Sequence, residues 1–212
     1  MSARTRTLGL KALIWVACLA PLVWSIWRFV RGEASVDPVE EWLHRSGKTA
    51  VIILVLSLAV TPLRRLFGWN VLQKTRRLLG LFAFFYAAVH VAVYLYFEQG
   101  LAWSFIWEDV VERPFIFSGT LAFLLLVPLA VTSTRGWIRR LGKRWVRLHQ
   151  LVYVAAGAAL LHYTWGQKAD IRDPLVISGI VAVLLAVRVW WAIQKRSGGR
   201  RAAGRAESTA SA

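Results

Sequence analysis

The chain has 212 residues, of which 57% are hydrophobic, and it carries a formal net charge of +16 at pH 7. This length suits one compact domain, but the apolar content is too high for an ordinary soluble fold. Its single cysteine, Cys18, excludes an intrachain disulfide, a cysteine-rich zinc site and an iron–sulfur cluster bound by this chain alone.

The apolar residues are concentrated in segments that approach the roughly 20 residues that a membrane-spanning helix needs. In chain order these segments are 10–30, 49–67, 78–97, 115–134, 148–165 and 174–193. The first follows basic residues, as a signal peptide would, but it is long, rich in tryptophan and without a clear cleavage site. We therefore predict an all-α bundle of six transmembrane helices over residues 1–196. Residues 197–212 are of low complexity and are predicted to form a disordered basic cytoplasmic tail.

The charged residues between the segments predict the orientation of the bundle. If the N-terminus is cytoplasmic, most of the 27 basic residues fall on the cytoplasmic side, and all of the 11 acidic residues except Glu207 fall on the other. This asymmetry follows the positive-inside rule, and an even number of spans places both termini in the cytoplasm. Because the lysines and arginines only interrupt long apolar runs, we do not expect nucleic-acid binding.

Three of the four histidines lie in or at the ends of the apolar segments, where ionisable groups are costly and mark functional sites. His90 and His162 each lie roughly 20 Å from the cytoplasmic ends of two helices that run in the same direction, at about 1.5 Å per residue. Two neutral imidazoles at one depth can bind a haem iron from both sides. His149 lies roughly 20 Å below His162, at a depth that suits a second redox centre.

Other interpretations of these residues stay open. On an ideal helix the side chains of His149 and His162 point about 140° apart, so facing one groove would need a bend. The small residues 154–159 suit either close helix packing or contact with a porphyrin, and the histidines could form interhelical hydrogen bonds. His44 lies in an acidic outer loop and is interpreted as a surface residue. Four inner-side arginines are available to haem propionates but also determine topology: Arg76, Arg77, Arg144 and Arg147.

Three functions are compatible with this pattern. The first is a haem b electron carrier, the membrane half of a two-subunit reductase. The second is a transporter or channel with a histidine-lined proton or ion path. The sequence disfavours this function, because it has no intramembrane carboxylates and no evident pair of broken helices in corresponding halves. The third is a quinol-linked cytochrome that works alone. The sequence has no glycine-rich nucleotide motif, no H-E-x-x-H metal motif and no soluble domain for a nicotinamide cofactor, so the electron donor and acceptor must be separate.

Several ordered stretches resemble the MsrQ (YedZ) family, the haem-binding membrane subunits of methionine-sulfoxide reductase systems. This family belongs to the ferric-reductase-like transmembrane superfamily, which includes the membrane part of NADPH oxidases. The resemblance covers about residues 8–195. The stretches that carry it are 61–65, 76–90, 113–114, 129–134 and 148–163.

The resemblance implies a cofactor set and partners. It implies b-type haem, one or two per chain, and FMN. Electrons would come from the quinone pool or a cytosolic flavin reductase, cross the bacterial inner membrane, and pass to MsrP. MsrP is a periplasmic molybdopterin enzyme, the partner in a heterodimer, that reduces methionine sulfoxide in oxidised proteins. This chain would then be the electron-transfer subunit rather than the catalytic one.

The family's haem histidines correspond to His90, His149 and His162. We expect His90 and His162 to bind the iron of an outer haem, and His149 to bind the iron of an inner haem that has no evident second ligand. Arg77, in the inner loop 73–77, is assigned to a haem propionate or to the flavin. The resemblance does not indicate the other flavin residues or the quinone site.

Overall fold

The computed structural model describes the backbone of residues 3–167 and 171–210, and the side chains of 5–167, 171–191, 193 and 194. Every element in this part of the chain is helical, which confirms the prediction of an all-α fold there. The α-helices are α1 (Ala3–Val30), α2 (Pro38–Phe67), α3 (Arg76–Val93), α4 (Trp103–Glu112), α5 (Pro114–Val131), α6 (Arg135–Leu141), α7 (Lys143–Leu148), α8 (Leu151–Gly166) and α9 (Arg172–Ala210). The 3₁₀-helix η1 (Asn70–Lys74) precedes α3, and the π-helix η2 (Tyr94–Glu98) follows it.

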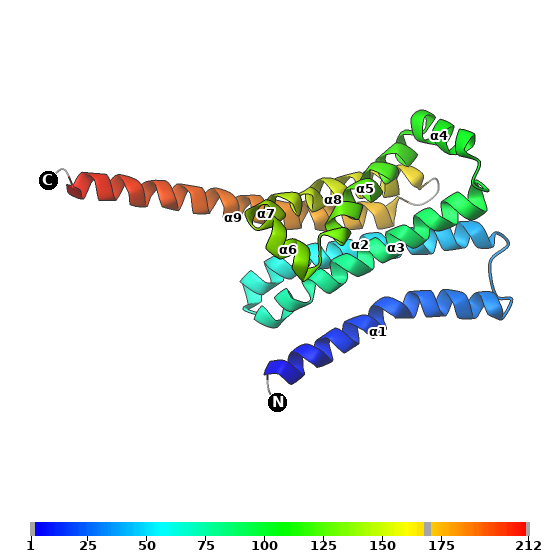
Figure 1. Cartoon of the computed structure of the whole chain (residues 1–212), viewed down its shortest axis with the longest axis horizontal. Coiled ribbons are helices and arrows are strands. Elements are labelled where there is room, and N and C mark those ends of the chain that lie inside the picture. Colours follow the sequence, from blue (N-terminus) through cyan, green and yellow to red (C-terminus); the bar gives the residue numbers. More distant parts are fainter. Residues whose placement is uncertain (1–2, 168–170, 211–212) are drawn as a thin grey trace.

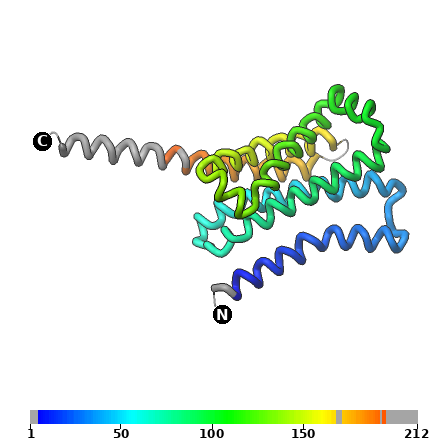
Figure 2. The backbone as a smooth tube through the Cα atoms, in the orientation of Figure 1, coloured from blue at the N-terminus to red at the C-terminus, as the bar shows by residue number. Residues whose placement is uncertain are grey.

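The long helices run side by side along one axis, with successive long helices in opposite directions (Figures 1 and 2). Helix α2 packs along α3, helix α5 packs along α8, and α9 contacts both α2 and α8. Helix α1 lies at the edge of this group. The main core cluster combines Leu58, Phe82, Ala83 and Tyr86 with Ala155 and Ala156 of α8. At these two alanines the small side chains therefore serve close helix packing.

Five described helices are long and apolar enough to cross a membrane: Thr5–Val30, Pro38–Phe67, Arg76–Glu98, Pro114–Val131 and Arg172–Trp191. The chain is thus a multi-pass membrane protein by length and composition. The predicted fifth segment corresponds to α8, which has 16 residues. At 1.5 Å per residue α8 is about 24 Å long, shorter than the roughly 30 Å hydrocarbon core. It is short because the helical path is interrupted at His149 and Gln150, between α7 and α8.

Helix α2 begins well before the apolar segment that predicts it. Asp37 caps its N-terminus by accepting a hydrogen bond from the Glu40 N–H at 3.0 Å, and Pro38 occupies the first turn. Glu40 and Glu41 also lie in that turn, where negative charge favours the helix dipole. The polar residues at the N-terminus of α2 therefore let the helix begin at Pro38, before the apolar segment 49–67.

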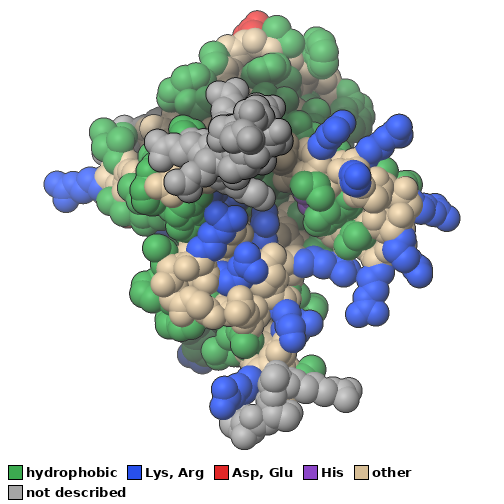
Figure 3. Space-filling model, turned by 90° about the vertical axis from the view of Figure 1, so that its left-hand side faces the viewer, with side chains coloured by type: hydrophobic (Ala, Val, Ile, Leu, Met, Phe, Trp, Pro, Cys, Tyr) green, Lys and Arg blue, Asp and Glu red, His purple; other side chains and the backbone are tan. Residues whose placement is uncertain are grey.

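Most of the described basic side chains gather at one end of the bundle. This end carries η1, α6 and α7, and Figure 3 views it with Lys and Arg side chains spread across it. The opposite end carries α4 and the connection between α1 and α2. The two ends therefore differ in charge as the positive-inside rule requires of a membrane protein. The backbone of α9 continues as helix to Ala210, while the side chains of 195–212 lie outside the described residues, and the disorder of the tail 197–212 stays a prediction.

Candidate functional site

The imidazoles of His90 and His162 face each other between α3 and α8. Their ring centroids are 5.8 Å apart and their planes make an angle of 76°. His90 lies in the last turn of α3, and His162 lies one turn before the end of α8. The structure thus brings together the two histidines whose distances from the helix ends predict a common depth.

Each of these rings is held by a backbone carbonyl from a neighbouring helix. Nδ1 of His90 lies 3.0 Å from the carbonyl oxygen of Leu43, and Nδ1 of His162 lies 2.7 Å from that of Phe115. A carbonyl oxygen only accepts hydrogen bonds, so each Nδ1 is the protonated donor and each Nε2 keeps its lone pair. Metal-binding histidines commonly have this second hydrogen bond, which fixes the tautomer and the ring orientation.

Two glycines make room for the imidazoles. A Cβ atom on Gly47 of α2 would lie 3.1 Å from Cε1 and Nδ1 of His90. A Cβ atom on Gly119 of α5 would lie 2.6 Å from Nδ1 of His162, closer than real Cβ contacts. Any larger residue at Gly119 would displace the ring or the helix. Sequence analysis missed both glycines, and its only available signal was an isolated glycine within an apolar helical segment.

The donor set fits haem iron. Metal–imidazole bonds are about 2 Å long, so two rings on opposite sides of one metal ion have centroids about 6 Å apart. The observed 5.8 Å agrees with that separation. Two neutral imidazoles are also a known axial ligand type for electron-transfer haems. Among the described residues there is no cluster of three or more His, Cys, Asp or Glu side chains suited to a metal ion.

His149 has a different environment. It follows the last residue of α7, at the basic end of the bundle, and its ring stacks on Trp145 with centroids 3.9 Å apart. Its Nε2 lies 3.1 Å from the Thr132 hydroxyl, which itself donates to the carbonyl of Pro128 at 2.6 Å. Nε2 is therefore the donor to Thr132, and Nδ1 keeps its lone pair. The helical path is interrupted between α7 and α8, next to His149.

Two further predicted residues are exposed. Arg77 lies in the first turn of α3, at the basic end of the bundle. Nδ1 of His44 lies 3.1 Å from the carbonyl oxygen of Glu40 on the same helix, and the exposure of His44 agrees with the interpretation as a surface residue. It lies in the first turns of α2 rather than in a loop, because α2 begins at Pro38.

The chain is similar to known membrane proteins over most of its length. Residues 46–160 match the model of the family described as "Ferric reductase like transmembrane component". The chain is 50% identical to a protein of Rhodospirillum rubrum over 188 residues, covering 88% of this chain and 90% of the relative. It is 45% identical to a protein of Xanthomonas axonopodis pv. citri over 198 residues, covering 91% of each. It is 44% identical to one of Xanthomonas oryzae pv. oryzae over 206 residues, covering 94% of each.

All three relatives are named "Protein-methionine-sulfoxide reductase heme-binding subunit MsrQ". No solved structure matches this chain. The range matched by the family model includes His90 but ends before His162, and the alignments with the relatives include both. The chain therefore belongs to the MsrQ family of haem-binding membrane subunits, within the ferric-reductase-like transmembrane proteins.

Proposed function

We propose that His90 and His162 are the two axial ligands of one b-type haem, through which this chain carries electrons across a membrane. The observation that carries this proposal is the facing pair of imidazoles, 5.8 Å apart, whose Nδ1 atoms both donate to carbonyl oxygens. When bound, haem b supplies a one-electron iron couple whose potential depends on its axial ligands and surroundings. The haem-binding function in the relatives' name supports the same cofactor.

The neighbouring residues have positioning roles in this proposal. The carbonyls of Leu43 and Phe115 hold the Nδ1 protons, so both Nε2 atoms keep a lone pair for the iron. This hydrogen bond also makes the imidazole a more basic ligand. Gly47 and Gly119 leave the space that the rings occupy.

At the basic end we propose a second cofactor region around His149. Its free Nδ1, the stacked Trp145 and the nearby start of α3 support this assignment. His149 is the proposed ligand of an inner haem iron. Arg77 is the proposed partner of a haem propionate or of FMN, because a guanidinium binds carboxylates and phosphates in bidentate geometry.

The proposed topology has six spans and cytoplasmic termini in the bacterial inner membrane. Helix α8 is the sixth span, although its own length is about 24 Å. Its packing along the full span α5 supports this, because α5 is a candidate membrane-spanning helix. The basic side chains at the end with η1, α6 and α7 support a cytoplasmic location for that end.

Electrons would enter from the quinone pool or from a cytosolic flavin reductase. They would leave to MsrP, the periplasmic molybdopterin subunit of a heterodimer that reduces methionine sulfoxide in oxidised proteins. The reductase named in the relatives' description supports such a partner. Co-purification with a periplasmic molybdoenzyme would distinguish this function from a quinol-linked cytochrome that works alone.

A reduced-minus-oxidised optical spectrum of the purified protein tests the haem assignment. We expect a b-type haem band that His90→Ala and His162→Ala each abolish for the same centre, because a haem that loses one strong axial ligand is poorly retained. His149→Ala should keep that centre, and His44→Ala is the matched control at a surface histidine. Wild-type spectra in either ligand variant would refute the proposed pair.

A further inference from the structure

A cleft of about 160 Å³ lies between α1, α2 and α3, beside the histidine pair. Its wall includes Leu22 and Ser25 of α1 together with residues of α2 between Trp42 and Ile52. On α3 it reaches Val89, the residue before His90. None of the histidine ligands proposed above lines it, so it is a separate space that adjoins the proposed haem site.

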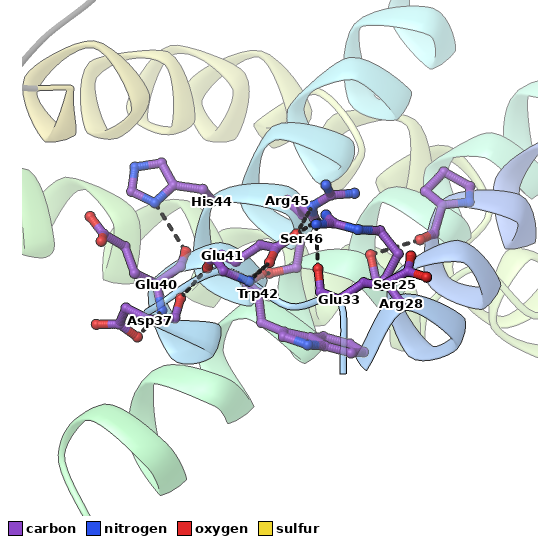
Figure 4. Close-up of polar contacts among 12 residues, drawn as sticks. Ser25, Arg28, Glu33, Asp37, Glu40, Glu41, Trp42, His44, Arg45 and Ser46 are labelled. Atoms are coloured by element: carbon purple, nitrogen blue, oxygen red, sulfur yellow. Dashed lines mark hydrogen bonds and ion pairs between the residues drawn. The ribbon is translucent and has the colours of Figure 1, made fainter. Parts of the chain in front are cut away.

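Helix α1 closes the cleft without filling it. Near the polar end, Arg28 pairs with Glu41 of α2 and donates to the carbonyl of Glu33 at 2.6 Å (Figure 4). Earlier in α1, the carbonyl oxygen of Cys18 accepts a hydrogen bond from the hydroxyl of Tyr86 at 2.6 Å. These contacts hold α1 on either side of the cleft.

One wall of the cleft is continuous with the surface that faces lipid. Ile52 lines the cleft and is 40% exposed on a helix that is a candidate membrane span. In a membrane bundle, exposed apolar side chains at mid-helix contact acyl chains. A ligand with a hydrocarbon chain can therefore enter sideways from the bilayer.

The charges around the cleft favour a neutral ligand. Its two cationic lining residues are already paired, Arg45 with Glu41 at 2.8 Å and Lys48 with Asp173. Each lining cation thus already has a carboxylate partner, which Arg45 shares with Arg28. No carboxylate lines the cleft among the described residues.

Its polar groups can recognise oxygen atoms on a ring. The hydroxyls of Ser25 and Ser46 donate to the carbonyls of Pro21 and Trp42, at 2.9 and 2.6 Å, so their lone pairs can accept from a ligand hydroxyl (Figure 4). Trp42 also lines the cleft, and an indole can offer an N–H donor to a ligand carbonyl as well as an aromatic surface. Carbonyl and hydroxyl oxygens on a planar ring are the two forms of a quinone head group.

The size and position of the cleft agree with this chemistry. An apolar cavity of about 150 Å³ holds one benzene molecule, so this cleft accommodates a single six-membered ring and not a porphyrin. The Ser46 hydroxyl oxygen lies 3.5 Å from Nδ1 of His90. A ring bound against Ser46 would therefore be separated from the imidazole by one side chain.

We propose that this cleft binds the head group of a lipid-soluble quinone, with its hydrocarbon chain leaving past Ile52 into the bilayer. The inference rests on the proposed supply of electrons from the quinone pool, and it adds the place where the carrier binds. Because that place adjoins His90, quinol electrons would enter this chain at the level of the proposed outer haem.

The test is equilibrium binding of decylubiquinone to the purified, haem-loaded protein in phosphatidylcholine nanodiscs, with bound quinone extracted and measured by chromatography. Ile52→Trp fills the cleft and should weaken binding at least about tenfold, because added volume in a packed site is costly. Leu56→Trp is the matched control, since Leu56 is also exposed on α2, at 50%, and does not line the cleft. Thr49→Val removes a lining hydroxyl with little change in volume and should weaken binding several-fold.

The outcomes separate this inference from the haem function. Weaker binding in Ile52→Trp and Thr49→Val, with Leu56→Trp and all haem spectra unchanged, supports the cleft. Equal quinone affinity in the wild-type protein and all three variants would show that the cleft does not bind quinone. This is also the result expected if only phospholipid occupies the cleft. Absence of quinone binding by the wild-type protein overturns both the cleft and the quinone donor, while the haem spectrum tests the haem independently.

Discussion

At the residue scale, the histidine pair depends on groups that carry no charge. The two imidazoles are oriented by carbonyls of Leu43 and Phe115, and the space they occupy is left by Gly47 and Gly119. Groups that hydrogen-bond to the other nitrogen of a metal-binding histidine fix the orientation of its ring before any metal binds. Preorganised ligands of this sort also restrict which ring tautomer is present.

Gly119→Ala tests this arrangement. The new Cβ would lie 2.6 Å from Nδ1 of His162, so the ring must move and its hydrogen bond to Phe115 is lost. We expect haem affinity to fall about tenfold, as when other outer partners of metal ligands are removed. Haem titration of the apoprotein measures this, and Gly179→Ala is the control because its Cβ would meet no atom within 4 Å. Equal haem affinity in both variants would contradict the positioning role.

At the element scale, a proline inside one helix is compensated by a side chain from another helix. Pro62 lacks an N–H, so the carbonyl of Leu58 one turn earlier has no helical partner. Arg188 of α9 donates to that carbonyl and to the hydroxyl of Tyr153 on α8. Because a free carbonyl is costly inside a membrane, this contact gives a reason for a half-buried cation in a candidate span, where Arg188 connects three helices.

Arg188→Met should therefore destabilise the bundle. It leaves the Leu58 carbonyl without a donor, at a cost of about 1–3 kcal/mol. In a Pro62→Ala background the backbone N–H can bond to Leu58, so the same substitution should cost less. Thermal unfolding in detergent of the two single variants and the double variant measures the difference. Strictly additive effects would show that Pro62 and Arg188 are not coupled.

At the scale of the whole molecule, charge and helix length set the orientation. Most of the described basic side chains lie at one end of the bundle, and five helices among the described residues are long and apolar enough to span. Whether the number of spans is even or odd depends on α8, which is shorter than the five candidate spans. If α8 crosses the membrane, the termini lie on the same side. If it does not, they lie on opposite sides.

Reporter fusions distinguish these topologies. We expect alkaline phosphatase to be inactive when fused at either terminus, and active when inserted at Gly100, between η2 and α4, because only the outer side supports its folding. Green fluorescent protein should be fluorescent when fused at either terminus. Phosphatase activity at one terminus only would mean an odd number of spans and would exclude α8 as the sixth.

The sequence alone determined the helical class, the apolar segments, the family and the residues of the histidine pair. Helix rise is local and nearly constant, so counting from the basic ends was enough to predict that His90 and His162 lie at one level. The direction in which a side chain points depends on packing, which the spacing along one helix does not determine. Only the tertiary structure therefore showed that the rings face each other at 5.8 Å.

The tertiary structure also decided contacts between residues far apart in the chain. The carbonyls that hold His90 and His162 each lie 47 residues away, and Arg188 lies 130 residues from Leu58. A backbone carbonyl carries no mark in the sequence, and neither Gly47 nor Gly119 differs there from a glycine that only relieves packing. The sequence thus determined which residues could bind a metal and at what depth. Packing decided how those residues are oriented and what lies beside them, because both depend on which helices become neighbours.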